Sequence, residues 1–157
     1  MRSGPLLSWD IFMDAHQKRM GLLNDVQSLK KISGKNKWTD TWDMEAALLQ
    51  HGKVVLVTDS LLHIVFASSN ILLMNGYLPK DVVGKTPRLF QGKNTSAATK
   101  QVVRKAIIKM QPFTVSLLNY RKNGSVYNCG IEAFPVFNNR KEHINYIAFE
   151  KILANDH

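Results

Sequence analysis

The sequence predicts an α+β domain that is built on a five-stranded antiparallel sheet and preceded by an N-terminal helical extension. Between residues 8 and 51, apolar side chains recur at steps of three and four, which is typical of amphipathic helices. From residue 53 onward, apolar residues form short runs and alternating stretches that are separated by Gly, Pro and Asn-Gly turn signals. With 157 residues, of which 45% are hydrophobic, the chain is long enough to bury one core.

The N-terminal segment is expected to contain two helices. The hydroxyl of Ser8 can cap the first helix by accepting a hydrogen bond from a free N–H of its first turn. Gly21 lies within this helix and weakens the expectation that it is continuous, and residues 33–37 form a polar break. A second helix is expected from a cap at Asp40 to a stop at Gly52. The apolar positions of the first helix are Phe12, Ala15, Leu22, Val26 and Leu29.

The remainder of the chain is expected to form the sheet and its short helices. We expect strands at 54–58 and 64–67, short helices at 69–75 and 80–83, a longer helix from 95 or 96 to 110, and strands at 113–120, 126–136 and 143–152. This order divides the chain into an N-terminal helical extension at 1–52, a domain at 53–153 and a tail at 154–157.

Two motifs show which family the chain resembles. Residues 84–92, Gly-Lys-Thr-Pro-Arg-Leu-Phe-Gln-Gly, resemble the signature G-R-N-C-R-F-L-Q-G of LOV domains, the flavin-binding blue-light receptor branch of the PAS superfamily. Residues 117–124, Leu-Leu-Asn-Tyr-Arg-Lys-Asn-Gly, are similar to the hairpin L-L-N-Y-R-K-D-G of that family. The resemblance extends over roughly residues 54–152. It implies a PAS fold, with short helices on one face of the five-stranded sheet, and a sensory role in signal transduction.

The resemblance also assigns candidate cofactor-binding residues. Arg88 and Arg104 match the arginines that hold the flavin phosphate in LOV domains, and Gln91 matches a glutamine of the pocket. Asn119 matches the first asparagine that binds the flavin ring. Alternation along its strand also places this residue on the face that carries Leu117, where a buried amide needs a hydrogen bond. Capping by nearby backbone is an equal alternative for Asn119.

At the ring end of the pocket, four positions depart from the LOV pattern. Thr86 stands in place of a ring-binding asparagine, Cys129 in place of a second one, and Glu150 in place of the signalling glutamine. Pro87 stands in place of the photoreactive cysteine, and because proline has no thiol, no cysteine–flavin adduct can form there. Cys129 and Glu150 remain candidate pocket residues. The cofactor is left open: flavin mononucleotide (FMN) fits the resemblance, but a flavin-free domain is favoured.

The outer face of the predicted sheet is unusually apolar. If Asn119, Cys129 and Glu150 point inward, six apolar side chains point outward, which is too many to leave exposed to water. The N-terminal segment is expected to cover them, either from its own chain or from a partner. We therefore expect a homodimer whose interface includes residues 9–49 and this outer face. The six residues are Leu118, Tyr120, Phe134, Val136, Ile147 and Phe149.

Composition limits the other classes of function. The net charge of +9 would suit nucleic acid, but no DNA- or RNA-binding motif is present, so nucleic-acid binding is not favoured. The sequence has no apolar run long enough for a membrane span or signal peptide, which indicates a cytoplasmic protein. Isolated histidines, and the absence of a P-loop or nucleophile motif, predict no enzyme. We expect a module that senses a small molecule or partner and signals to a downstream protein. A flavin-binding protein without the adduct, a constitutive scaffold and a basic nucleic-acid-binding regulator are the alternatives.

Overall fold

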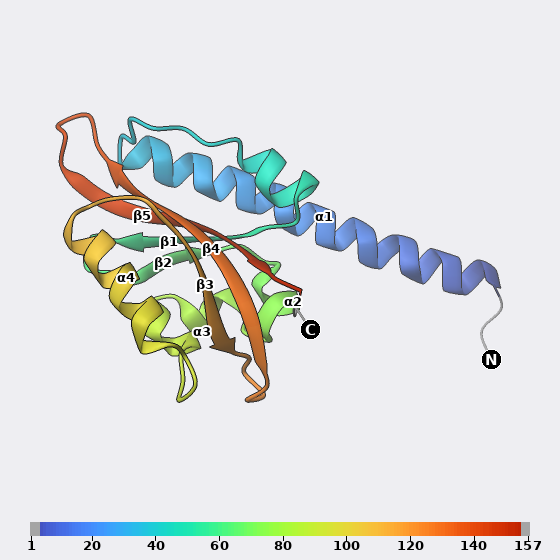
Figure 1. Ribbon diagram of the computed structural model, residues 1–157. Coiled ribbons are helices and arrows are strands. Elements are labelled where there is room, and N and C mark those ends of the chain that lie inside the picture. Colours follow the sequence, from blue (N-terminus) through green and yellow to red (C-terminus); the bar gives the residue numbers. More distant parts are fainter. Residues whose placement is uncertain (1–3, 155–157) are drawn as a thin grey trace.

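The computed structural model describes residues 4–154, and Figure 1 shows its elements along the chain. Between those residues, no helix is long and apolar enough to cross a membrane. The elements are α1 (Gly4–Lys35), the π-helical turn η1 (Ala46–Gln50), β1 (Val54–Asp59), β2 (Ile64–Ala67), α2 (Ile71–Asn75), α3 (Pro79–Val82), the 3-10 helix η2 (Pro87–Phe90), α4 (Ala97–Ile108), β3 (Phe113–Tyr120), β4 (Val126–Phe137) and β5 (His143–Ile152).

The five strands form one antiparallel sheet in the order β2-β1-β5-β4-β3. The short helices α2, α3 and η2 pack on one face through an apolar cluster that includes Ile71, Val82 and Phe90, and α4 lies on the same side (Figure 1). Helix α1 and the turn η1 pack on the other face through a second cluster. The predicted fold class and the order of its elements are therefore confirmed. The bounds predicted for β2, β3 and β5 agree with the structure residue for residue.

Helix α1 is longer than the sequence suggested, and it is continuous. It begins at Gly4, so Ser8 lies inside it and is not its cap. Pro5 falls in the first turn, where a residue without an N–H is tolerated. The helix continues through Gly21, where the absence of a side chain allows close approach to Ser69: a Cβ at Gly21 would lie 3.1 Å from the Ser69 hydroxyl oxygen. One turn later, Asp25 accepts hydrogen bonds from the Ser69 N–H and hydroxyl, at 2.7 and 2.8 Å.

The second helix also begins later than expected. Asp40 lies outside it, and the Asp43 carboxylate instead accepts a hydrogen bond from the Ala46 N–H at 3.0 Å. Gly52 follows the turn with a φ of +60°, a backbone conformation that glycine adopts at little cost, so the predicted stop is in place. This segment positions Ala47 and Leu48 against the sheet.

The outer face of the sheet is covered by helices of the same chain. Val26 and Leu29 of α1 pack with four of the six residues that were expected to point outward, namely Phe134, Val136, Ile147 and Phe149. The other two lie outside this cluster, and the hydroxyl of Tyr120 accepts a hydrogen bond from the Asn94 N–H at 2.9 Å. The part of the outer face formed by these four residues is therefore covered by the chain's own helix, one of the two alternatives expected from the sequence.

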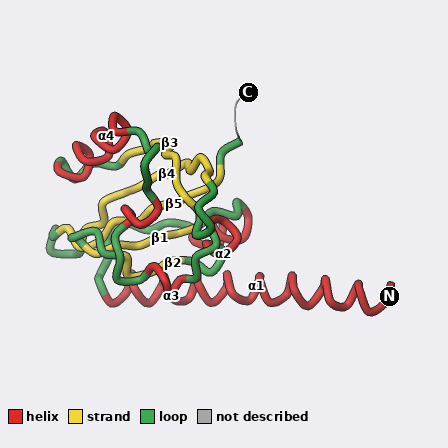
Figure 2. Tube along the Cα trace, turned by 90° about the horizontal axis from the view of Figure 1, so that it is seen from below, coloured by secondary structure: helices red, strands yellow, loops and turns green. Residues whose placement is uncertain are grey.

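The two halves of α1 have different surroundings. Its C-terminal half lies along the sheet, whereas its N-terminal half projects beyond the domain, as Figure 2 shows from below. The projecting half exposes an apolar surface, in which the rings of Trp9 and Phe12 stack at 5.7 Å. Its large exposed apolar residues are Trp9, Ile11, Phe12 and Met20.

A buried amide fixes the C-terminal end of α1 to the sheet. Asn145 of β5 accepts hydrogen bonds from the Asn36 amide at 3.0 Å and from the Trp38 indole N–H at 2.8 Å. It also donates to the Thr58 carbonyl of β1 at 2.9 Å. With its side chain only 3% exposed, Asn145 uses both its donor and its acceptor inside the protein.

A candidate ligand-binding cavity between α4 and the sheet

A cavity of about 440 Å³ lies between α4, η2 and the inner face of the sheet, which is within the usual size range of small-molecule sites. Strand alternation explains which side chains form its floor. On β5, Tyr146, Ala148 and Glu150 point to the inner face, and the first two are paired across the ladder with Thr58 and Leu56 of β1. Strands β3 and β4 complete the floor with Phe113, Leu117, Ile131 and Ala133.

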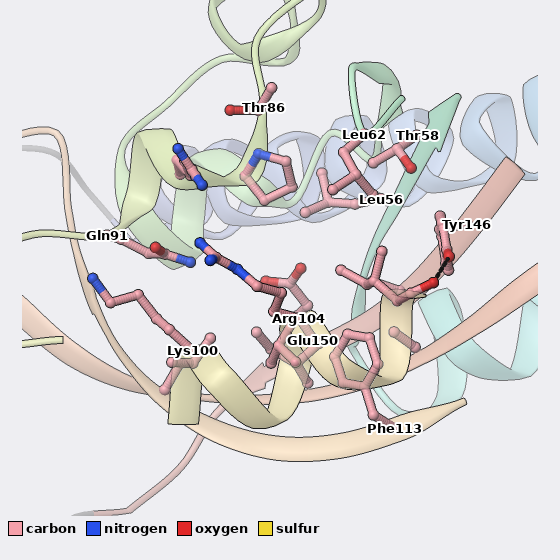
Figure 3. Close-up of a pocket in the computed structure, with 18 of the residues that line it drawn as sticks. Leu56, Thr58, Leu62, Thr86, Gln91, Lys100, Arg104, Phe113, Tyr146 and Glu150 are labelled. Atoms are coloured by element: carbon pink, nitrogen blue, oxygen red, sulfur yellow. Dashed lines mark hydrogen bonds between the residues drawn. The ribbon is translucent and has the colours of Figure 1, made fainter. Parts of the chain in front are cut away.

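Helix α4 forms the roof of the cavity because three of its residues share one face. Val103 and Ile107 are one turn apart and line the cavity, and Arg104 lies beside them. Ser96 caps this helix by accepting a hydrogen bond from the Thr99 N–H at 3.2 Å. The helix is then tied to the floor at its far end, where the Tyr146 hydroxyl donates to the Ile107 carbonyl at 3.1 Å (Figure 3).

Basic and amide side chains gather at one side of the cavity. Figure 3 shows Gln91, Lys100 and Arg104 on that side, with Leu62 and Phe113 on the other. A second hollow adjoins the cavity and is lined by Arg88, Gln91, Ala97, Lys100, Gln101 and Arg104. Three of these residues are basic, namely Arg88, Lys100 and Arg104, and among residues 4–154 none of the three forms an ion pair with a carboxylate. Within the described residues, the mouth therefore carries three positively charged side chains that have no carboxylate partner.

Glu150 brings a carboxyl group into the floor of the cavity. It is buried, and the thiol of Cys129 donates a hydrogen bond to Glu150 Oε1 at 3.3 Å. Burial disfavours the ionised form and raises the pKa of Glu150 from 4.5 to about 7. Burial and the nearby carboxyl group of Glu150 also raise the pKa of Cys129, so its thiol stays protonated.

The structure separates the six predicted binding residues into two groups. Arg88, Gln91, Arg104 and Glu150 line the cavity. Asn119 and Cys129 are on the predicted face of the sheet but do not line the cavity, since they are buried beside it.

Cys129 packs in the inner cluster with Met74, Phe90 and Tyr127, which covers this part of the sheet. Asn119 is paired across the ladder with Tyr127, and its Oδ1 accepts no hydrogen bond from any residue in the described range. A shared face thus predicted the direction of these side chains but not their access to the cavity.

Several lining residues were not anticipated from the sequence. Lys100 lies one turn before Arg104 on α4, and this spacing could have identified it as a second basic residue at the mouth. Leu61 and Leu62 come from the turn between β1 and β2, where no periodic pattern gives a signal. Pro87 is the first residue of η2, as its preference for the first turn of a helix predicted, and it lines the cavity as well.

An antiparallel sheet that holds a cavity under short helices defines a small α+β domain with a candidate ligand site, and comparison with known proteins gives the family. Residues 53–151 match the family model described as "PAS domain", so the chain belongs to the PAS domain family. It is a sensory signalling module of that family.

Similar proteins and similar solved structures agree with this assignment to the PAS domain family. The chain is 42% identical over 74 residues to Protein TWIN LOV 1 of Arabidopsis thaliana, and 33% identical over 87 residues to Phototropin-2 of Oryza sativa subsp. japonica. These alignments cover 47% and 55% of this chain but only 18% and 10% of the relatives. The dark structure of the blue-light photoreceptor Aureochrome1 LOV superposes with a TM-score of 0.67 at 26% identity, covering 74% of this chain and 87% of that one.

The residues of the cavity fit FMN at one end only. Arg88, Lys100 and Arg104 could hold its phosphate, because guanidinium and ammonium groups bind phosphate oxygens well. The ring end fits poorly, since Asn119 and Cys129 do not reach the cavity and Thr86 offers one short hydroxyl side chain. The polar contacts that would recognise a flavin ring are therefore mostly missing.

We expect no cysteine–flavin adduct to form in this protein under blue light. Pro87 has no thiol, and the Cys129 thiol is buried beside Glu150 outside the cavity. Protein mixed with FMN should show no slowly recovering loss of the flavin absorption band after illumination. If such a bleach appeared and was absent from Cys129→Ala, the photochemistry would have moved to Cys129, which would contradict this expectation.

Proposed function

We propose that this PAS domain binds a small molecule in the cavity under α4 and relays its presence to other proteins through α1. The observation that carries this proposal is the arrangement of β5 between the cavity and the helix. Ala148 and Glu150 line the cavity on one face of this strand, while Ile147 and Phe149 pack under α1 on the other. A ligand that moves β5 would therefore act on the packing of α1.

The size of the cavity favours a sensor over a constitutive scaffold. A scaffold would be expected to fill its own pocket with side chains, because empty apolar space destabilises a core. Here about 440 Å³ remains open between α4 and the sheet. Binding energy from a ligand in this space could then shift the balance between two arrangements of α1.

We include in this proposal that the chain forms a homodimer through the projecting half of α1. That half exposes Trp9, Phe12 and Met20, whose positions share one side of the helix, and large apolar side chains gathered on one surface favour contact with another protein. Its charges balance, since Lys18 pairs with Asp14 at 2.9 Å, and this does not suit an anionic membrane or nucleic acid. A second copy of the same helix offers a matching apolar surface.

Native mass spectrometry of the full chain tests both parts of the proposal. The wild-type protein should appear as a dimer at micromolar concentration and carry a bound small molecule. Phe12→Glu should weaken dimerisation about tenfold or more, because it places a charge in an apolar contact. Gln17→Glu adds the same charge at an exposed position of the same helix and serves as the control. A wild-type protein that is strictly monomeric would contradict the dimer.

Ligand binding is tested in the same measurement by filling the cavity. Ala133 lies on its floor, so Ala133→Phe should remove the bound mass. Val103→Trp fills the cavity from the α4 side and covers the case in which Ala133→Phe does not fold. If both variants fold and keep the bound mass, the ligand lies elsewhere and the cavity is not the sensory site.

A further inference from the structure

The cavity is chemically divided into a cationic mouth and an apolar interior. Arg88, Lys100 and Arg104 approach the mouth from two different elements, η2 and α4. These three side chains have no acidic partner in the part of the chain that the structure describes. Like charges placed close together repel one another, so a bound anion would relieve this repulsion and gain charge-assisted hydrogen bonds.

The interior offers a ligand almost no free polar group at the end away from the mouth. The two hydroxyl groups there already donate inside the protein. Thr58 Oγ1 donates to the Asp59 carbonyl at 2.9 Å, and the Tyr146 hydroxyl donates to the Ile107 carbonyl at 3.1 Å. The remaining walls at this end are hydrocarbon, contributed by Leu56, Leu62, Phe113 and Ala133. Such walls favour an apolar ligand that needs no hydrogen bonds.

We propose that the ligand is an amphiphilic anion, with a carboxylate or phosphate head on an unbranched hydrocarbon chain. This inference rests on the proposed function, because it names the class of molecule that the sensory cavity takes. The head lies at the mouth between Arg88, Lys100 and Arg104, and the chain extends past Glu150 toward Phe113 and Leu62.

Two observations favour a hydrocarbon chain over the flavin ring of FMN. A flavin ring carries several nitrogen and oxygen atoms at its edge, and burying them without partners is costly. The amide of Asn119 and the thiol of Cys129 are outside the cavity. The hydroxyl groups of Thr58 and Tyr146 already donate their protons within the protein, so they offer a ligand no donor. A hydrocarbon chain has no polar atom to satisfy, and each methylene that leaves water contributes favourably.

Glu150 is compatible with an anionic ligand. Its carboxyl group lies in the floor, between the basic side and the apolar side of the cavity in Figure 3. The Cys129 thiol donates to it from the core side, and among residues 4–154 it forms no ion pair with Arg88 or Arg104. The arginines therefore remain available for the head group of the ligand.

Titration calorimetry with the full chain tests the class of ligand. The probes are octanoate, decanoate, decan-1-ol, inorganic phosphate and FMN, with the two carboxylates kept below their micelle-forming concentrations and decan-1-ol below its solubility limit. Affinity should rise about fourfold per methylene, and so about fifteenfold from octanoate to decanoate. Decanoate should bind about tenfold more tightly than decan-1-ol, since only the carboxylate reaches the cations. Inorganic phosphate alone should bind weakly.

Variants assign the two ends of the ligand. The double variant Arg88→Gln with Arg104→Gln should weaken decanoate about tenfold and leave decan-1-ol unchanged. Lys105→Gln removes a positive charge from an exposed position of α4 outside the lining, so it should change neither affinity.

Two results would overturn the ligand class. One is FMN binding more tightly than decanoate, and the other is an affinity that does not depend on chain length. In either case the proposed function would stand if Ala133→Phe abolishes binding of whichever probe the wild-type protein binds. The proposed function fails separately if the bound molecule of the purified protein persists in both cavity-filling variants.

Discussion

Replacing Glu150 by glutamine is expected to stabilise the protein by about 3 kcal/mol at about pH 8 and to change its stability little at about pH 4. Glutamine has nearly the same shape as a protonated glutamic acid but cannot ionise. Because the carboxyl group is buried, the folded protein holds its proton more tightly than the unfolded chain does, and its pKa is raised from 4.5 to about 7. The variant removes the cost of ionising this group inside the fold.

The direction of the pH dependence follows from this shift. Below the unfolded pKa of 4.5, both states are protonated and Glu150 costs nothing. As the pH rises from 4.5 to about 7, the unfolded chain loses its proton first, so the free energy of unfolding falls across this window. Above it, both states are ionised and the loss of stability is complete. Stability from Glu150 is thus present at acidic pH and lost as the pH rises.

Urea unfolding between about pH 4 and pH 8 measures this effect. The wild-type protein should lose stability over the window, and Glu150→Gln should lose about 3 kcal/mol less. Glu132→Gln makes the same chemical change at an exposed position of β4 and serves as the control. Equal pH dependence in wild type and Glu150→Gln would show that Glu150 is ionised at little cost in the folded protein, by reaching water or a cation.

The sheet could be predicted well from the sequence because its signals are local. The alternation and turn signals around β3 and β5 predicted the observed bounds of both strands. The two-residue period of a strand also predicted that Leu117 and Glu150 point to the inner face of the sheet. Pro87 at the start of η2 is another local effect, since it depends on the fixed φ of proline alone.

The course of α1 was harder to predict because a helix period does not reveal what covers it. Phe12 and Val26 belong to the same predicted face, yet Phe12 is 58% exposed and Val26 is 1% exposed. The sheet reaches only the second half of the helix, and that limit is set by the tertiary structure. For the same reason, the sequence could not tell whether the outer face is covered by its own chain or by a partner.

The candidate site was predicted in part for a similar reason. Arg88, Gln91, Arg104 and Glu150 line the cavity, as the family resemblance implied. Asn119 and Cys129 lie on the predicted face, but side chains that are distant in sequence close over them. Strand alternation gives the direction of a side chain, whereas access depends on packing between elements.

The largest effect on the attachment of α1 is expected from Asn145→Ala. The change leaves the Trp38 indole N–H and the Thr58 carbonyl without their partner, and it also removes the bond from Asn36. Each polar group that is buried without a partner costs about 1–3 kcal/mol, so the variant should lose about 3 kcal/mol of unfolding free energy. Asn36→Ala removes only one of these hydrogen bonds and should lose about 1 kcal/mol.

Asn145 also connects the wall of the cavity to the end of α1, because Thr58 lines the cavity while Asn36 and Trp38 follow the helix. Hydrogen exchange should therefore become faster in the C-terminal half of α1 in Asn145→Ala, and it should change less in Asn36→Ala. If α1 keeps its protection in Asn145→Ala while the whole protein is destabilised, the apolar contacts of Val26 and Leu29 alone hold the helix. That result would remove Asn145 from the connection between cavity and helix, and would leave β5 packing as the route by which ligand binding reaches α1.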